Sequence, residues 1–185
     1  DRPGGRPGRR SDLTAVELRS RHLAAGHVEV YRSSAPGFAN AFLMLGAPQI
    51  GVRHSRRISG LRKVTRQQWD TGQIWDDEIG VSTSLSPKFA NISVPYGALI
   101  PAELDNILGA GKHVACDASS HTFLREIPQC WLTGQAAGVA AALAAAQNKR
   151  PRDIDARAIQ HELARQGAYL SPAIEKALRP ASAAE

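Results

Sequence analysis

The sequence is poor in cysteine and in aromatic residues. Its 185 residues include two cysteines, Cys116 and Cys130, and only 5% are Phe, Trp or Tyr. The two cysteines form neither a CxxC motif nor a zinc-ligand spacing, so we expect no disulfide framework, no redox pair, no metal site and a reducing, cytoplasmic location. The scarcity of aromatic residues also argues against a base-stacking platform for nucleic acid.

Long apolar runs are absent as well. No run reaches the ~20 residues needed to span a bilayer, and no signal peptide is visible, so the sequence predicts no membrane span. Hydrophobic residues make up 43% of the chain, which is enough for a core. The net charge is +6, but residues 1–10 alone carry four Arg among three Gly and two Pro. We expect a flexible basic arm there, and an RNA-binding arm is the alternative.

Residue patterns predict both helices and strands along the chain. Apolar periodicity and capping residues indicate helices, whereas alternation or short apolar runs indicate strands. The predicted helices are 12–32, 66–70, 129–147 and 156–166. The predicted strands or extended segments are 49–59, 79–84, 92–100 and 106–110, of which the last is a short buried strand.

Residues 106–146 are the most informative stretch. An apolar run leads into a Gly-x-Gly turn at Gly109 and Gly111, a polar loop follows, and Pro128 stands where the first turn of a helix tolerates proline. This order is typical of a strand, loop and helix that contact a dinucleotide. However, the chain lacks a GxGxxG motif and the acidic residue about twenty positions after it. On its own it cannot form a complete dinucleotide-binding domain.

Several motifs occur together and in a characteristic order. They are G-x-R-x-x-R-R-x-x-G at 51–60, PY-x-x-L-x-P at 95–101, N-I-L-x-A-G-K at 106–112, Asp-x-x-x-His-x-x-x-Arg at 117–125 and GQAAG at 134–138. Over residues 11–170 or so, this set resembles the C-terminal half of FAD-dependent oxidoreductases of the glutathione-reductase-like class. The N-terminal half of that family, with its GxGxxG motif, has no counterpart here.

The resemblance implies an α/β fold class, or α+β for the chain in isolation. The chain would form part of a β-sheet substrate domain, and the closing strand and helix of an FAD-binding Rossmann-like domain completed by another chain. The implied division is a basic arm (1–10), a substrate-domain portion (11–94), a C-terminal FAD-binding segment (95–148) and a C-terminal helix and tail (149–185).

The resemblance also implies a function. The chain would be the smaller subunit or a fragment of an FAD-dependent dehydrogenase or oxidase, inactive alone, that oxidises a small organic substrate by hydride transfer to flavin N5. A second polypeptide would carry the GxGxxG half, whether through a split gene, a cleaved precursor or truncation. Two other functions stay open: a non-catalytic accessory subunit that stabilises a flavoprotein partner, and a basic nucleic-acid binder.

The FAD contacts implied by the resemblance lie in the 106–146 stretch. Gly109 and Gly111 allow the backbone to approach the ribityl and pyrophosphate groups. The helix that begins near Pro128 presents backbone N–H groups and its positive dipole end to the flavin. Lys112 and Asp117 would contact phosphate and hydroxyl groups, or else be a surface lysine and a loop cap. The predicted cofactor-binding residues are Gly109, Gly111, Lys112, Asp117, Ile127, Pro128, Gln129 and Cys130.

Two pairs of residues are candidates for work on the substrate. His121 and Arg125 are four positions apart and would share one face of a helical turn. His121 is a candidate acid–base group, or alternatively a structural histidine, and Arg125 would hold an anionic substrate group or the flavin edge. Arg53 and Arg57 share one face of the predicted strand 49–59 and would bind substrate, or else pair with the partner chain.

Overall fold

The structure is a computed structural model that describes residues 10–54, 56–83 and 91–179. The chain divides into two compact units, Asp1–Arg56 and Arg57–Glu185. The boundary between them falls inside the substrate-domain portion predicted over residues 11–94. The predicted basic arm lies outside the described residues, apart from Arg10, at which the first helix begins.

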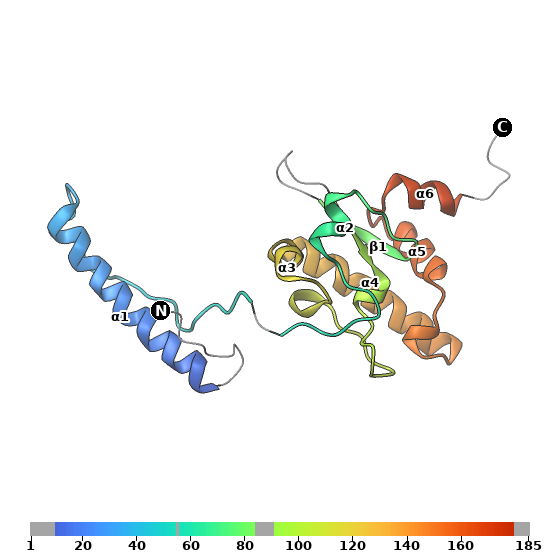
Figure 1. Cartoon of the computed structure of the whole chain (residues 1–185), viewed down its shortest axis with the longest axis horizontal. Helices are drawn as coiled ribbons and strands as arrows, with labels where there is room; N and C mark the ends of the chain where they lie inside the picture. Colours follow the sequence, from blue (N-terminus) through green and yellow to red (C-terminus); the bar gives the residue numbers. More distant parts are fainter. Residues whose placement is uncertain (1–9, 55, 84–90, 180–185) are drawn as a thin grey trace. The chain divides into compact units, whose positions relative to one another are not determined.

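The first unit is built on one long helix, α1 (Arg10–Ser34), drawn in blue in Figure 1. It confirms the helix predicted over residues 12–32. The helix continues through Gly26, because a glycine in a helix interior costs only about 1 kcal/mol. The Arg21 guanidinium donates to the carbonyl oxygen of Pro48 at 3.0 Å. The segment that follows the helix therefore runs back along it.

The prediction of a strand over residues 49–59 is wrong for the described residues of that range, none of which lies in a strand. The nearest pairing is a single antiparallel bridge between Gly60 and Pro101. Ile58 donates its N–H to the carbonyl oxygen of His113 at 2.9 Å, again as a single bond. The alternation of apolar and polar residues shows which side chains would share a face of a strand. A strand forms, however, only where a second strand pairs with it along its length.

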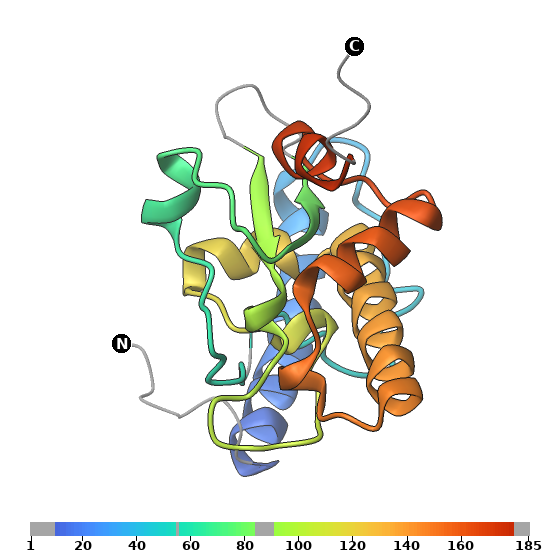
Figure 2. The same ribbon diagram turned by 90° about the vertical axis from the view of Figure 1, so that its right-hand side faces the viewer.

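The second unit contains a small antiparallel sheet with helices around it (Figure 2). Its strands are β1 (Glu78–Ser82) and β2 (Ile92–Pro95). Its α-helices are α2 (Arg66–Asp70), α3 (Ala118–Leu124), α4 (Ile127–Gln147), α5 (Ala156–Arg165) and α6 (Pro172–Leu178). Both α4 and α5 pack against β1. The strand register shifts between Glu78 and Gly80, where Gly80 lies against Leu132 of α4.

The helices α2, α4 and α5 confirm the predictions for 66–70, 129–147 and 156–166. The predicted strand 79–84 matches β1 over its first residues. The extended segment predicted over 92–100 is a strand only as far as Pro95, and a 3-10 turn, Tyr96–Ala98, follows. The helices α3 and α6 were not predicted.

The prediction of a buried strand at 106–110 is wrong. None of these residues lies in a strand, and the side chain of Ile107 is 50% exposed. The segment still reaches the core at Gly109, whose N–H donates to the carbonyl oxygen of Leu99 at 2.8 Å. Within the described chain, no neighbouring strand pairs with it.

The core of the second unit joins β2, the turn after it and the inner faces of the helices. Fully buried apolar side chains from distant parts of the chain meet there, among them Val94, Leu99, Leu124, Ala140 and Ile159. Trp69 of α2 anchors α3, because its indole N–H donates to the Ser120 hydroxyl at 2.9 Å. The described fold is therefore a mixture of helices with a two-stranded sheet. No helix among the described residues is long and apolar enough to cross a membrane.

Candidate functional site

The N-terminus of α4 is the centre of the candidate site. Glu126 is its N-cap residue, but no side chain caps the helix, and Pro128 lies in its first turn. The first N–H groups of a helix have no partner inside the helix and carry its positive dipole end. Ile127 and Trp131 beside this end are 65% and 73% exposed. The predicted cofactor residues Ile127, Pro128, Gln129 and Cys130 thus surround an uncapped, partly apolar helix end.

The Gly109–Gly111 turn is fastened to this helix by a hydrogen bond that the sequence analysis missed. Gly111 has φ +77°, a left-handed conformation that favours glycine. Its N–H donates to the Thr133 hydroxyl at 2.9 Å, and that hydroxyl donates to the carbonyl oxygen of Gln129 at 2.8 Å. Thr133 is fully buried and lies in the second turn of α4. A threonine inside a small-residue helix gives no local signal of such a long-range bond.

Arg125 lies at the junction of α3 and α4. It is the C-cap residue of α3, and its side chain is only 11% exposed. One guanidinium nitrogen contacts Glu126 at 3.1 Å. The buried Nε of Arg125 and the buried Oε1 of Gln129 have no hydrogen-bond partner. A buried polar atom without a partner is costly, so both atoms suit a ligand or water at this helix end.

His121 is enclosed by the protein. Its side chain is fully buried, and its Nε2 lies 2.7 Å from the backbone carbonyl oxygen of Lys112. A carbonyl oxygen only accepts, so Nε2 carries the proton in this bond. The structure thereby connects His121 to the Lys112 backbone, while the Lys112 side chain is exposed. This enclosure favours the structural interpretation of His121, and its acid–base role stays a prediction.

Asp117 acts as a cap in this structure. One carboxylate oxygen accepts the N–H of Ser120 at 2.7 Å, and the other accepts the N–H of Arg66 at 2.8 Å. Burial raises the pKa of Asp117, but hydrogen bonds from Arg66 and Ser120 outweigh it, so the pKa lies below its ordinary value. Both oxygens hold the starts of α2 and α3 in place. A cofactor hydroxyl would have to share them.

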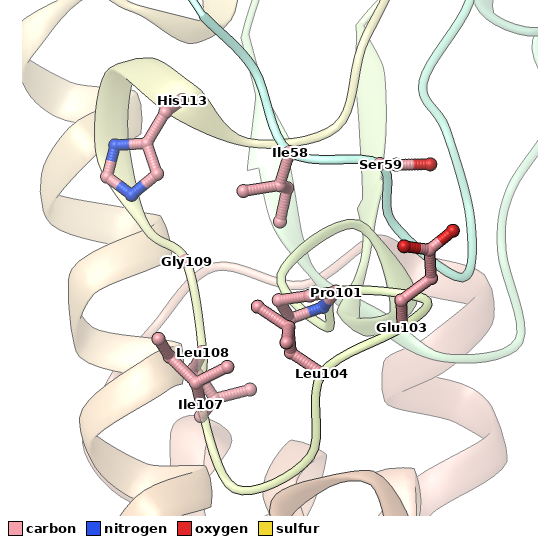
Figure 3. Close-up of a pocket in the computed structure, with 9 residues that line it drawn as sticks. All are labelled: Ile58, Ser59, Pro101, Glu103, Leu104, Ile107, Leu108, Gly109 and His113. Carbon is pink, nitrogen blue, oxygen red and sulfur yellow. The ribbon is translucent and has the colours of Figure 1, made fainter.

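A cavity of about 390 Å³ lies beside the Gly109 backbone (Figure 3). Most of its lining is apolar, with Glu103 and His113 as the charged or titratable residues. The lining residues are Ile58, Ser59, Pro101, Glu103, Leu104, Ile107, Leu108, Gly109 and His113. A carboxylate with apolar neighbours is a poor environment for a phosphate. The cavity fits apolar protein side chains better than the pyrophosphate predicted near Gly109.

The two arginines predicted to bind substrate lie in different compact units, Arg53 in the first and Arg57 in the second. Arg53 is exposed and Arg57 is half-buried. The strand that would have put them on one face is not formed, so their joint role stays a prediction.

Both cysteines are free. Cys116 is buried, and desolvation raises the pKa of its thiol to about 11. Desolvation and the nearby Glu126 also raise the pKa of Cys130, whose sulfur donates to the carbonyl oxygen of Arg125 at 3.4 Å. Both thiols are therefore protonated at neutral pH and weakly nucleophilic. Among the described residues, no three His, Cys, Asp or Glu side chains are grouped as metal ligands.

A family model described as FAD dependent oxidoreductase matches residues 4–163. No curated protein and no solved structure matches the chain. The match covers most of the sequence, including the 106–146 stretch and the α4 N-terminus, and it indicates FAD as the cofactor. The chain belongs to the family of FAD dependent oxidoreductases.

Proposed function

We propose that this chain forms the closing part of the FAD site in an oxidoreductase whose GxGxxG half lies on a second polypeptide. The reaction would be the two-electron oxidation of a small organic substrate by hydride transfer to flavin N5. The observation that carries the proposal is the uncapped N-terminus of α4, with the partnerless Nε of Arg125 and the Gly111 turn beside it.

The residues at this helix end fit a group such as the flavin ring, which has carbonyl oxygens and gains negative charge on reduction. The first turn of α4 offers backbone N–H groups, and Arg125 offers an N–H donor together with a positive charge. A charge at a helix N-terminus is stabilised by roughly 0.3–1 kcal/mol, and by more when it is partly buried. When bound, FAD accepts the two electrons that leave the substrate. We assign the holding of its ring to Ile127, Gln129 and Arg125.

His121 and Asp117 hold α3, which precedes this site, in position. The bond from His121 to the Lys112 carbonyl oxygen and the cap formed by Asp117 fix α3, and therefore the position of Arg125 at its end. The side chain of His121 is fully buried, and its Nε2 proton is engaged by that carbonyl oxygen. We therefore propose Arg125 as the residue of this pair that meets the cofactor or substrate, and His121 as a residue that positions it.

The exposed surface of α4 supports a partner. Apart from their chain neighbours and the backbone of α4 itself, Gly134 and Gly138 have no atom within 4 Å of where a side chain would begin. Their lack of side chains therefore serves no close packing within the described chain. Trp131 is exposed on the same helix. Small residues let a strand of another polypeptide approach a helix closely, and an exposed tryptophan is typical of an interface.

Native mass spectrometry of the chain purified from its own cells tests the proposal. We expect a complex that contains a second polypeptide and one FAD. In this complex Arg125→Met should reduce the FAD content, whereas Arg165→Met should not, because Arg165 pairs with Glu162 on an exposed face of α5. Circular dichroism would verify that both variants fold. A complex that keeps FAD and turnover when this chain is omitted would contradict the proposal.

A complex that keeps FAD and turnover without this chain would instead favour the accessory subunit, which stabilises a flavoprotein without contributing to its site. The nucleic-acid binder predicts affinity for DNA or RNA that falls with salt and persists without a partner. Its basic arm, apart from Arg10, lies outside the described residues, so deletion of residues 1–10 is the direct test.

A further inference from the structure

A second cavity, of about 250 Å³, lies between β1, β2 and the start of α6. It is distinct in its lining from the α4 site, and nothing in the proposed function uses it. Its lining residues are Gly72, Gln73, Ile74, Glu78, Val81, Asn91, Ser93, Tyr169, Ser171 and Pro172. The exposed side chains of Ile74 and Tyr169, 47% and 55% accessible, mark the side that opens to solvent.

Glu78 is the unusual member of this lining. Its side chain is fully buried, and one carboxylate oxygen accepts the N–H of Ser171 at 2.6 Å. The other oxygen, Oε2, is buried and has no hydrogen-bond partner. The hydroxyl oxygen of Ser171 is also buried without a hydrogen-bond partner. Two buried oxygen atoms without a hydrogen-bond partner thus belong to residues that line one cavity.

The charge around Glu78 is negative and is not balanced within the described chain. Asp76, Asp77 and Glu78 are consecutive, and the guanidinium of Arg62 pairs with Asp76 and Asp77. Three carboxylates less one guanidinium leave a charge of −2. Glu78 forms no ion pair of its own among the described residues. A buried carboxylate is usually accompanied by a cation or by several hydrogen bonds. The carboxylate of Glu78 has a single hydrogen bond, from the Ser171 N–H.

We propose that this cavity binds a small organic ammonium ion, with Glu78 as its counter-ion. A primary ammonium carries three N–H donors and no acceptor, which matches Glu78 Oε2 and the Ser171 hydroxyl. Ile74, Val81 and Pro172 provide apolar surface for a short hydrocarbon body. A bare metal ion fits less well, because Ca²⁺ takes six to eight oxygen ligands and the apolar part of the lining offers none. The cavity volume limits the ligand to a small molecule.

The proposal is tested by titrating the full chain with n-butylammonium chloride in an isothermal calorimeter at neutral pH. Butan-1-ol, sodium butyrate and potassium chloride, at matched ionic strength, serve as neutral, anionic and metal-ion comparisons. We expect saturable binding of butylammonium only. Glu78→Gln keeps the shape and an acceptor for Ser171 N–H but removes the charge, so it should weaken binding at least tenfold. Glu175→Gln, which alters an exposed carboxylate of α6, should bind like the wild type.

Nuclear magnetic resonance of the wild-type chain keeps the proposal testable if Glu78→Gln does not fold. The Ser171 amide signal should shift on addition of butylammonium and not on addition of butan-1-ol. Absence of saturable binding would overturn the proposal, and so would equal binding by a folded Glu78→Gln variant. Binding of potassium as tight as that of butylammonium would also overturn it, by showing a simple cation site. None of these results depends on FAD or on a partner.

Discussion

Replacing Gly138 by alanine should stabilise the isolated chain. Gly138 lies in the interior of α4 and is exposed, and an added Cβ would meet nothing within 4 Å beyond its chain neighbours and the helix's own backbone. Glycine is less favourable than alanine in a helix interior by about 0.8–1 kcal/mol. Because nothing opposes the new methyl group, this difference should appear almost in full as a higher free energy of unfolding.

Gly60→Ala is the matched opposite case in the same compact unit. A Cβ at Gly60 would lie 2.6 Å from the Cβ of Ala115, 2.8 Å from the carbonyl oxygen of Arg62 and 3.0 Å from that of Gly97. Backbone atoms cannot turn away as a flexible side chain can. Overpacking of this kind costs roughly 1–3 kcal/mol. We therefore expect the two glycine-to-alanine changes to have opposite signs.

Urea unfolding followed by far-ultraviolet circular dichroism measures both effects. The midpoint should rise for Gly138→Ala and fall for Gly60→Ala, with the slope unchanged. The melting temperature should follow, by about 2–4 °C per kcal/mol for a chain of this size. A lower midpoint for Gly138→Ala in the isolated chain would refute the reasoning from open space around this glycine. If a partner covers this face of α4, the same variant should assemble less tightly, because the methyl group then meets the partner.

Three further changes test single contacts. Tyr96→Phe removes the buried bond from the Tyr96 hydroxyl to the carbonyl oxygen of Pro151, 2.8 Å long, and should lower the free energy of unfolding by about 1–3 kcal/mol in chemical denaturation. Asp117→Asn should lower it by about 1–2 kcal/mol at neutral pH, since the amide has a single acceptor oxygen and its NH2 group cannot accept the second backbone N–H. The pKa of Asp117 is lowered by folding, so this stabilisation is present above the unfolded pKa, about 4, and the gap between variant and wild type should close as pH falls through the folded pKa. Iodoacetamide should label Cys130 faster than the buried Cys116 in the native chain, as mass spectrometry of peptides would show, and equal native rates would contradict the assigned burial.

The parts of the fold that the sequence predicts are those decided by neighbouring residues. The start of α2 follows from Thr65, whose N–H donates to the Gln68 side chain, and the start of α5 follows from Asp155, which accepts from the N–H of Arg157. The start of α3 has the same kind of signal in Asp117, which accepts from the N–H of Ser120, although the sequence predicted only a cofactor contact or a loop cap for this residue.

The parts that could not be predicted depend on residues far apart in the sequence. The bond from Gly111 to Thr133 joins a loop to a helix, and Thr133 has no periodic or motif signal that marks it. The burial of His121 is equally non-local, because it depends on how α3 packs. The spacing of His121 and Arg125 could not tell that the first would be fully buried and the second 11% exposed.

Residues 106–110 show that a local pattern can also predict an element that the structure lacks. Their apolar run is typical of a buried strand, yet a strand exists only where another strand pairs with it. In the described chain the segment borders a cavity of about 560 Å³ that Ala137 and Ala141 of α4 also line. Ile107 is half exposed there, and the open space around Gly138 lies on the same helix. A strand of a second polypeptide, placed between this segment and α4, would pair with the segment and fill the cavity. The second polypeptide proposed above would thus account both for the failed strand prediction and for the exposed isoleucine.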